Sequence, residues 1–135
     1  MEIAKTVGTR ATCLRRSVGA VIVRQRRILT TGYNGAPRGV PHCEEYGCDI
    51  TQRCQLAAHA EQNAIAQAAA NGVSCEGATV YVTCQPCSGC AKLMINAGIK
   101  RVVFEGEYPD PLAVELFEMA GVELNRMAGA VEVDA

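Results

Sequence analysis

Residues 78–104 read ATVYVTCQPCSGCAKLMINAGIKRVVF. The segment opens with a short apolar run at Ala78 to Thr83 and closes with a second one at Arg101 to Phe104, and both runs are rich in β-branched residues. Residues 88–97 between them favour a helix, and Gly98 supplies a helix stop. A strand, a helix and a second strand in this order are the unit from which α/β folds are built.

The elements on both sides extend this pattern. We expect a first helix over residues 2–15, a hairpin made of strands Ser17 to Val23 and Ile28 to Tyr33, helices over Leu56 to Asn71 and Pro111 to Ala120, and an edge strand over Val122 to Leu124. The order predicts an α/β fold with three α/β/α layers around a central mixed sheet of about five strands. A chain of 135 residues suits one domain, residues 1–135, with about 125–135 as a loosely held tail.

The composition excludes several classes of protein. Hydrophobic residues make up 49% and charged residues 20%, and no apolar run approaches the roughly 20 residues of a membrane span. The first ten residues lack the apolar core of a secretory signal, so we expect a cytoplasmic location. In that compartment the eight cysteines are better explained as metal ligands and buried thiols than as disulfides.

The charges are divided unevenly along the chain. Residues 1–53 hold nine Lys and Arg against four Asp and Glu, whereas residues 54–135 hold four against ten. Either arginines gather around a phosphate, or oppositely charged faces meet in an oligomer. Basic residues are scattered and only 4% of residues are aromatic, so we expect a small anionic ligand and no polynucleotide surface.

Metal-binding side chains occur in two separate segments. His59 supplies an imidazole, and Cys87 and Cys90 supply two thiolates. Three such ligands leave the fourth tetrahedral position of a zinc ion open for water, as in catalytic sites. The cysteines begin a predicted helix, where amide donors and the helix dipole favour thiolates. Neighbouring strand ends should bring the two ligand-bearing helix N-termini together.

A carboxylate accompanies the predicted zinc site. Glu61 follows His59 by two residues and can carry the protons of the water. Zinc lowers the pKa of that water from 15.7 to about 7, which supports hydrolytic deamination of a pyrimidine at C4. Glu61 would accept the water proton, deliver it to ring N3 and later protonate the departing ammonia. His-x-Glu with Pro-Cys-x-x-Cys is the signature of zinc deaminases.

Several further stretches make the similarity more specific. They are GYNGAPRG at 32–39, His42-Cys43, AHAEQNAI at 58–65, YVT at 81–83 ahead of Pro-Cys-x-x-Cys, and INAGIKRVV at 95–103. Together they resemble the deoxycytidylate (dCMP) deaminase family over about residues 13–124. The resemblance implies the cytidine-deaminase fold, conversion of dCMP to dUMP and ammonia for thymidylate synthesis, and a homohexamer. It also implies dCTP and dTTP as effectors, with Mg2+ accompanying their phosphates.

The resemblance also implies contacts to the substrate. Asn34 would read the deoxyribose hydroxyl, Tyr108 would lie near the 5′-phosphate, and Ala60 is a further substrate-binding candidate. A guanidinium can bind phosphate through two hydrogen bonds, which makes three arginines candidates for the phosphate: Arg16, Arg38 and Arg53. Alternatively Asn34 only satisfies a turn, and the arginines are solvated. After Tyr108 the chain has Pro109-Asp110, where relatives can carry a basic residue.

A second cysteine group lies in the polar, irregular segment 40–55, which a metal would hold better than an apolar face. It is similar to a structural zinc site in some deoxycytidylate deaminases, which implies four ligands, with His42 as a substitute for one of them: Cys13, Cys43, Cys48 and Cys54. The alternative is reduced cysteines in an irregular loop. Cys75 and Cys84 are expected to be non-ligand thiols, and Cys84 could lie close to the catalytic zinc.

Other functions remain open at this point. The enzyme could deaminate a free nucleoside or another cytosine nucleotide, or be a competence-associated relative with an unassigned substrate. A nucleic-acid editing deaminase shares the core motif, but the chain lacks a basic tail and aromatic platforms. A non-catalytic zinc-binding interaction module would have no use for Glu61 beside an open ligand position.

Overall fold

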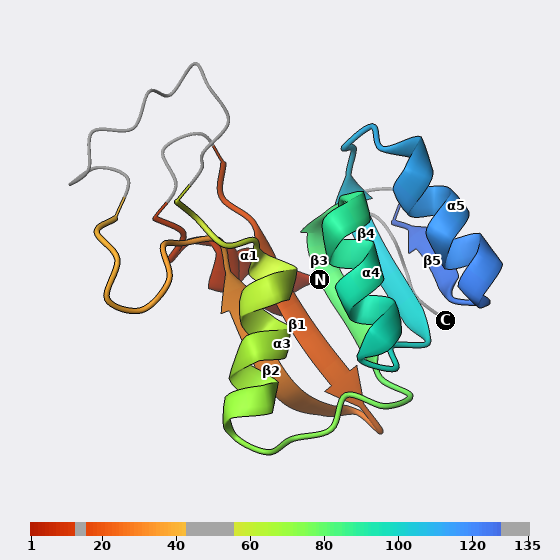
Figure 1. The fold of residues 1–135 in the computed structure, drawn as a ribbon, viewed down its shortest axis with the longest axis horizontal. Coiled ribbons are helices and arrows are strands. Elements are labelled where there is room, and N and C mark those ends of the chain that lie inside the picture. Colours follow the sequence, from red (N-terminus) through yellow and green to blue (C-terminus); the bar gives the residue numbers. More distant parts are fainter. Residues whose placement is uncertain (13–15, 43–55, 128–135) are drawn as a thin grey trace.

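The computed structural model describes residues 1–12, 16–42 and 56–127. Its elements are α1 (Glu2–Gly8), β1 (Gly19–Arg24), β2 (Arg27–Tyr33), α3 (Ala60–Ala70), β3 (Thr79–Cys84), α4 (Ser88–Asn96), β4 (Arg101–Gly106), α5 (Pro111–Ala120) and β5 (Glu123–Arg126) (Figure 1). No helix in these ranges is both long and apolar enough to cross a membrane.

The five strands form one mixed sheet in the order β2-β1-β3-β4-β5. Strand β1 is antiparallel to β2 and to β3, and we call β1 and β2 the hairpin half. Strands β3, β4 and β5 are mutually parallel and form the parallel half. The five-stranded mixed sheet predicted from the sequence is confirmed.

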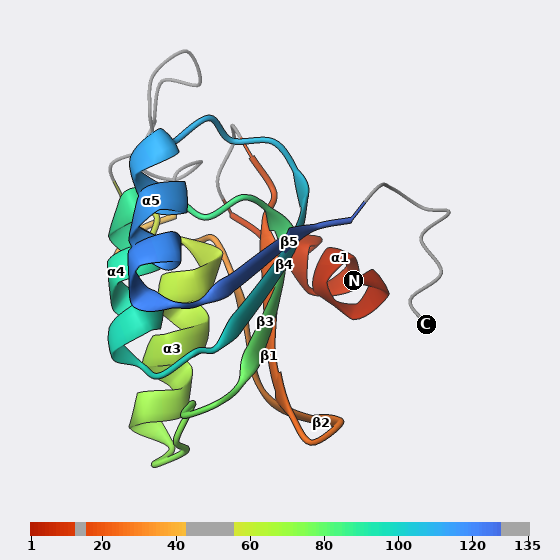
Figure 2. The ribbon, with the colours of Figure 1, turned by 90° about the vertical axis from the view of Figure 1, so that its right-hand side faces the viewer.

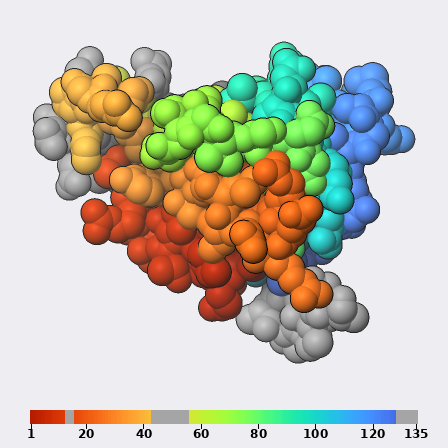
Figure 3. Space-filling view, turned by 90° about the horizontal axis from the view of Figure 1, so that it is seen from below, coloured from red at the N-terminus to blue at the C-terminus, as the bar shows by residue number. Residues whose placement is uncertain are grey.

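Helices cover both faces of the sheet, as Figure 2 shows: α3, α4 and α5 lie on one face and α1 on the other. In the space-filling view the orange atoms of the hairpin half lie between the red N-terminal residues and the green atoms of α3 and the segment after it (Figure 3). The predicted three-layer α/β/α arrangement is therefore confirmed.

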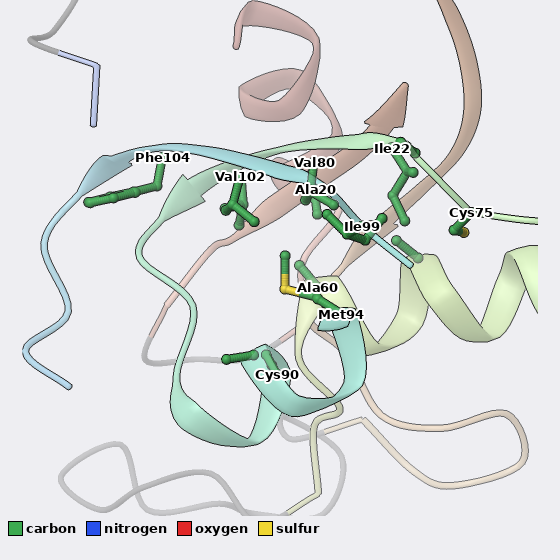
Figure 4. Packing of buried hydrophobic residues seen from close by; sticks show 14 of the residues in the cluster. Ala20, Ile22, Ala60, Cys75, Val80, Cys90, Met94, Ile99, Val102 and Phe104 are labelled. Atoms are coloured by element: carbon green, nitrogen blue, oxygen red, sulfur yellow. The ribbon is translucent and has the colours of Figure 1, made fainter. Parts of the chain in front are cut away.

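The core lies between the sheet and the three helices on its first face. Val80 and Val82 of β3 alternate with more exposed neighbours, as expected for a strand whose inner face is buried. Met94 points from α4 toward the sheet and lies beside Ala60 of α3 (Figure 4). Each such fully buried Val or Met side chain contributes about 1.5–3 kcal/mol to stability. This packing holds α3 and α4 in place.

Two predicted helix boundaries were wrong. The first helix ends at Gly8 and does not continue to residue 15, and a Cβ on Gly8 would lie 3.0 Å from the amide nitrogen of Gly19. The second predicted helix begins at Ala60 and not at Leu56, because Ala58 instead forms a β-bridge with Gly35. In both places a tertiary contact overrides the local helix propensity.

The last strand of the sheet, β5, extends two residues beyond the predicted end at Leu124. Strand β5 continues to Arg126, and the amide of Met127 donates to the carbonyl of Phe104 at 2.7 Å. Residues 125–127 of the predicted tail therefore belong to this edge of the sheet, and residues 128–135 lie outside the described residues.

Candidate metal centre and active site

Helices α3 and α4 both begin toward the end of the sheet at which β3 and β4 have their carboxyl ends (Figure 1). His59 is the N-cap residue of α3, and Cys87 is the N-cap residue of α4. The strand-to-helix connection at Gln85 and Pro86 places Cys87 directly after β3, and the side chain of Pro86 is fully buried. Both ligand-bearing segments therefore come from rigid elements.

The structure brings the three predicted metal ligands together. Nδ1 of His59 lies 3.2 Å from Sγ of Cys90 and 3.4 Å from Sγ of Cys87. All three donor atoms lie within 4.8 Å of one another. A nitrogen and a sulfur on one tetrahedral zinc ion lie about 3.5 Å apart, given ligand bonds of about 2.0–2.3 Å. The donor set and its spacing fit zinc.

Contact between the two sulfurs moves their pKa values in opposite directions. A hydrogen bond from Cys90, followed by one involving the imidazole of His59, lowers the pKa of Cys87 to about 3. The same bond to Cys87, together with burial, raises the pKa of Cys90 far above its ordinary value. Zinc binding would require Cys90 to lose its proton, because only the thiolate is a ligand, and its position in the first turn of α4 favours that loss.

Glu61 lies in the first turn of α3 and is only 5% exposed. Burial raises the pKa of this carboxyl to about 6, although the neighbouring charge of His59 opposes the shift. A buried carboxyl with a pKa close to neutral can both accept and release a proton in that range. The arrangement therefore combines a metal-ligand cluster with a proton carrier two residues away.

Two residues of α3 hold His59 in place. Oε1 of Gln62 accepts a hydrogen bond of 2.7 Å from the amide of His59. Nδ2 of Asn63 donates to the carbonyl of Tyr33 at 2.8 Å, which connects α3 to the end of β2. Neither residue was among the predicted site residues. The Gln at the third helical position is a known capping signal and could have identified the first contact.

Three of the predicted substrate residues lie in one region. The guanidinium carbon of Arg16 lies 5.1 Å from the ring centre of Tyr108. Asn34 is buried, and its Nδ2 donates to the carbonyl of Arg16 at 2.9 Å while its Oδ1 accepts from the amide of Val18 at 2.7 Å. Asn34 therefore anchors the backbone that carries Arg16.

The remaining predicted residues divide into three groups. Arg38 and His42 are exposed, and neither belongs to the cluster of His59, Cys87 and Cys90. Ala60 is fully buried, and its amide occupies the first helical position, which has no partner within the helix. Five residues lie outside the described residues: Cys13, Cys43, Cys48, Arg53 and Cys54.

The two cysteines predicted to be non-ligands lie outside the three-residue cluster. Cys75 is buried in the core. Burial is the main cause that raises the pKa of Cys84 to about 11. The charges of Glu61 and Cys87 raise this pKa further, whereas the charge of Arg16 lowers it. Cys84 therefore lies within electrostatic range of both the metal ligands and the Arg16 region.

Comparisons with known proteins agree with this geometry. The family model of the cytidine and deoxycytidylate deaminase zinc-binding region matches residues 1–106. The chain is 48% identical to the ComE operon protein 2 of Bacillus subtilis, over 94% of this chain and 68% of that protein. It is 37% identical to the deoxycytidylate deaminase of Schizosaccharomyces pombe, over 93% of this chain but only 42% of that longer protein.

A solved structure extends the similarity to three dimensions. The dCMP deaminase of cyanophage S-TIM5, in complex with dCMP and dUMP, superposes with a TM-score of 0.85 at 31% identity, and the match covers 93% of this chain and 92% of that one. The sequence match, the fold and the His59, Cys87 and Cys90 cluster point to the same conclusion. The chain belongs to the cytidine and deoxycytidylate deaminase family, whose members share this zinc-binding region.

Proposed function

We propose that the chain hydrolyses dCMP to dUMP and ammonia with the help of a zinc ion. The observation that carries the proposal is the cluster of His59, Cys87 and Cys90 with the buried Glu61 two residues from the imidazole. Family membership and the likeness to a deaminase whose structure contains dCMP and dUMP support it. The product would supply thymidylate synthesis.

The protein groups in the cluster have separate roles in this proposal. His59, Cys87 and Cys90 would hold the zinc and leave a fourth position open. Zinc bound there lowers the pKa of a water from 15.7 to about 7, which supplies the nucleophile for C4 of the cytosine ring. Glu61 would take one proton from the water and transfer it to ring N3, and would then take the remaining proton from the new C4 hydroxyl and deliver it to the amino group as the C4–N bond breaks, which leaves the C4 carbonyl of dUMP and ammonia. Its burial keeps bulk water away from these transfers.

We place the phosphate of dCMP against Arg16. The side chain of Arg16 is exposed and stacks on Tyr108, an arrangement that leaves the edge of the guanidinium free to donate to phosphate oxygens. Asn34 would use the second N–H of its amide for the deoxyribose hydroxyl, because the first is already donated to Arg16. Arg38 and Arg53 remain further candidates for the phosphate.

A comparison of four substrates tests this function directly. We expect a higher kcat/KM for dCMP than for deoxycytidine, CMP or dCTP when all are assayed on one zinc-loaded preparation. Equal values for dCMP and deoxycytidine would contradict the phosphate site and favour a nucleoside deaminase. No turnover of any of the four would favour the non-catalytic zinc-binding module. Activity on single-stranded DNA would instead indicate an editing enzyme.

The resemblance to the family supports further proposals about assembly and regulation. We propose a cytoplasmic homohexamer that dCTP and dTTP regulate, with Mg2+ bound to the phosphates of these effectors. Light scattering tests the hexamer, and rates measured with each effector, with and without Mg2+, test the regulation. For the second zinc site, we propose Cys13, Cys43, Cys48 and Cys54 as ligands, with His42 as a substitute. Metal analysis that finds one zinc per subunit would reject it.

A further inference from the structure

Asp110 connects the first turn of α4 to the first turn of α5. One carboxylate oxygen, Oδ2, accepts a hydrogen bond of 2.8 Å from the amide of Ser88, and the other, Oδ1, accepts one of 3.3 Å from the amide of Ala113. The main-chain carbonyl of Asp110 accepts a third from Nε2 of Gln85 at 3.3 Å. Two of the three donors, Gln85 and Ser88, lie immediately before and after Pro86 and Cys87 in the chain.

The position of Cys87 explains why α4 needs an acceptor from another segment. The N-cap side chain normally accepts a hydrogen bond from an amide of the first turn, because these amides have no partner within the helix. Cys87 occupies the N-cap position of α4 but makes no such bond, since its sulfur lies against the imidazole of His59. Asp110, in the connection between β4 and α5, supplies an acceptor for a different amide of the same turn, that of Ser88.

We infer that Asp110 is a positioning residue that fixes the first turn of α4 and thereby sets Cys87 and Cys90 against His59. The inference rests on the proposed zinc function. A negative carboxylate also complements the positive N-terminal end of α4. The hydrogen bond from Ser88 is the main reason that the pKa of Asp110 lies below its ordinary value, which is consistent with a charged acceptor at this place.

A simpler role for Asp110 would be to cap α5 alone, and two substitutions separate the alternatives. Asp110→Ser retains a good N-cap for Ala113, but its single hydroxyl oxygen replaces two carboxylate oxygens and cannot serve both helices. Ser88→Pro removes the donor from the other side and leaves Asp110 intact. Proline is favoured at the first helical position, and the extended backbone of Cys87, with φ −78 and ψ 171, suits a residue before proline.

Zinc transfer to a chromophoric chelator measures the proposed effect. We expect zinc affinity to fall about 10–100-fold in each variant, as is typical when the residues that orient metal ligands are lost. The double variant should be no worse than either single one, because both remove the same bond. Cobalt-substituted protein should show an altered thiolate-to-metal absorption band. Glu107→Ser is the matched control, because Glu107 lies in the same connection but pairs with Arg126 on the surface.

The outcomes separate this inference from the proposed function. Unchanged zinc affinity and an unchanged cobalt spectrum in both variants would overturn the positioning role and leave Asp110 as a cap of α5. A fall in zinc affinity in Glu107→Ser as large as that in Asp110→Ser would also overturn it. The chelator and cobalt measurements need no turnover, so a wild-type protein that binds zinc but deaminates no cytosine nucleotide would reject the proposed function alone.

Discussion

Nδ1 of His59 lies 3.2 Å from Sγ of Cys90, although 31 residues separate the two in the chain. His59 caps α3, which packs on the hairpin half, whereas Cys90 belongs to α4, which directly follows β3 of the parallel half. The metal geometry therefore depends on how these two helices are positioned.

Replacing the proton carrier should separate metal binding from turnover. We expect Glu61→Gln to retain zinc and to lower kcat on dCMP about 10²–10⁴-fold, because the amide keeps the size of the side chain but cannot accept the water proton. Zinc content is measured on the same preparation. Glu118→Gln, an exposed change on α5, is the control. Full activity in Glu61→Gln would rule out the proposed mechanism.

Removing the guanidinium of Arg16 should affect only substrates that carry a phosphate. A charge-assisted hydrogen bond contributes about 1.5–3 kcal/mol, so Arg16→Ala should raise KM for dCMP about 10–100-fold and leave kcat/KM for deoxycytidine unchanged. Arg27→Ala removes an exposed cation in β2 and serves as the control. An equal loss on both substrates would argue that Arg16 does not contact the phosphate.

Asn34 should affect both the nucleotide and the nucleoside. In Asn34→Asp one oxygen can still accept from Val18, but the other would face the carbonyl of Arg16 without a proton to donate. We expect a loss of about 1–3 kcal/mol in the free energy of unfolding and a higher KM for both dCMP and deoxycytidine. Asn71→Asp is the control, because Asn71 is exposed and bonds only within the end of α3. An unchanged KM for deoxycytidine would contradict the contact with the sugar.

Gly32 permits the close approach of β2 to the start of α3. A Cβ at this position would collide with the carbonyl of Ala60 and lie 2.5 Å from the amide nitrogen of Ala64. Gly32→Ala should therefore destabilise the fold by about 1–3 kcal/mol and weaken zinc binding, since α3 must move. Thr31→Ala, at the exposed neighbouring position, should change neither chemical denaturation nor zinc release. Normal zinc affinity in Gly32→Ala would show that α3 tolerates the shift.

Cys84 should react slowly with alkylating reagents at neutral pH. Its pKa is raised to about 11, mainly by burial, and only the thiolate reacts. We expect its rate with iodoacetamide, followed by peptide mass spectrometry, to rise about tenfold for each pH unit between 7 and 10. A cysteine in an unstructured peptide, with a pKa of about 8.5, should instead level off from about one pH unit above that value. A plateau for Cys84 already at pH 8.5 would contradict this shift.

Sequence patterns were sufficient for the parts of the structure that local chemistry determines. The β-branched runs around Val80 and Val102 predicted buried strands, and Gly98 and Gly121 follow the helices that they were expected to end. The i, i+3 spacing placed Cys87 and Cys90 on one side of a helix N-terminus. These features depend on residues close together in the chain.

Contacts between distant segments explain what the patterns missed. Residues 56–58 have helix-forming composition, but the pairing of Ala58 with Gly35 keeps them out of α3. Asp110 followed by Pro111 is a recognisable helix start, and this signal gave no indication that the same carboxylate holds Ser88. The stacking of Arg16 on Tyr108 likewise joins segments that are far apart in the sequence.

The two halves of the sheet meet only where β1 pairs with β3. A cation held by His59 on one side of this line and by Cys87 and Cys90 on the other is therefore a bridge across it. Any separation of the halves must break a ligand bond, so opening and metal release are thermodynamically linked. The midpoint temperature of unfolding should then rise with the logarithm of the free zinc concentration. The stability of the protein would therefore depend on how much zinc is available to it.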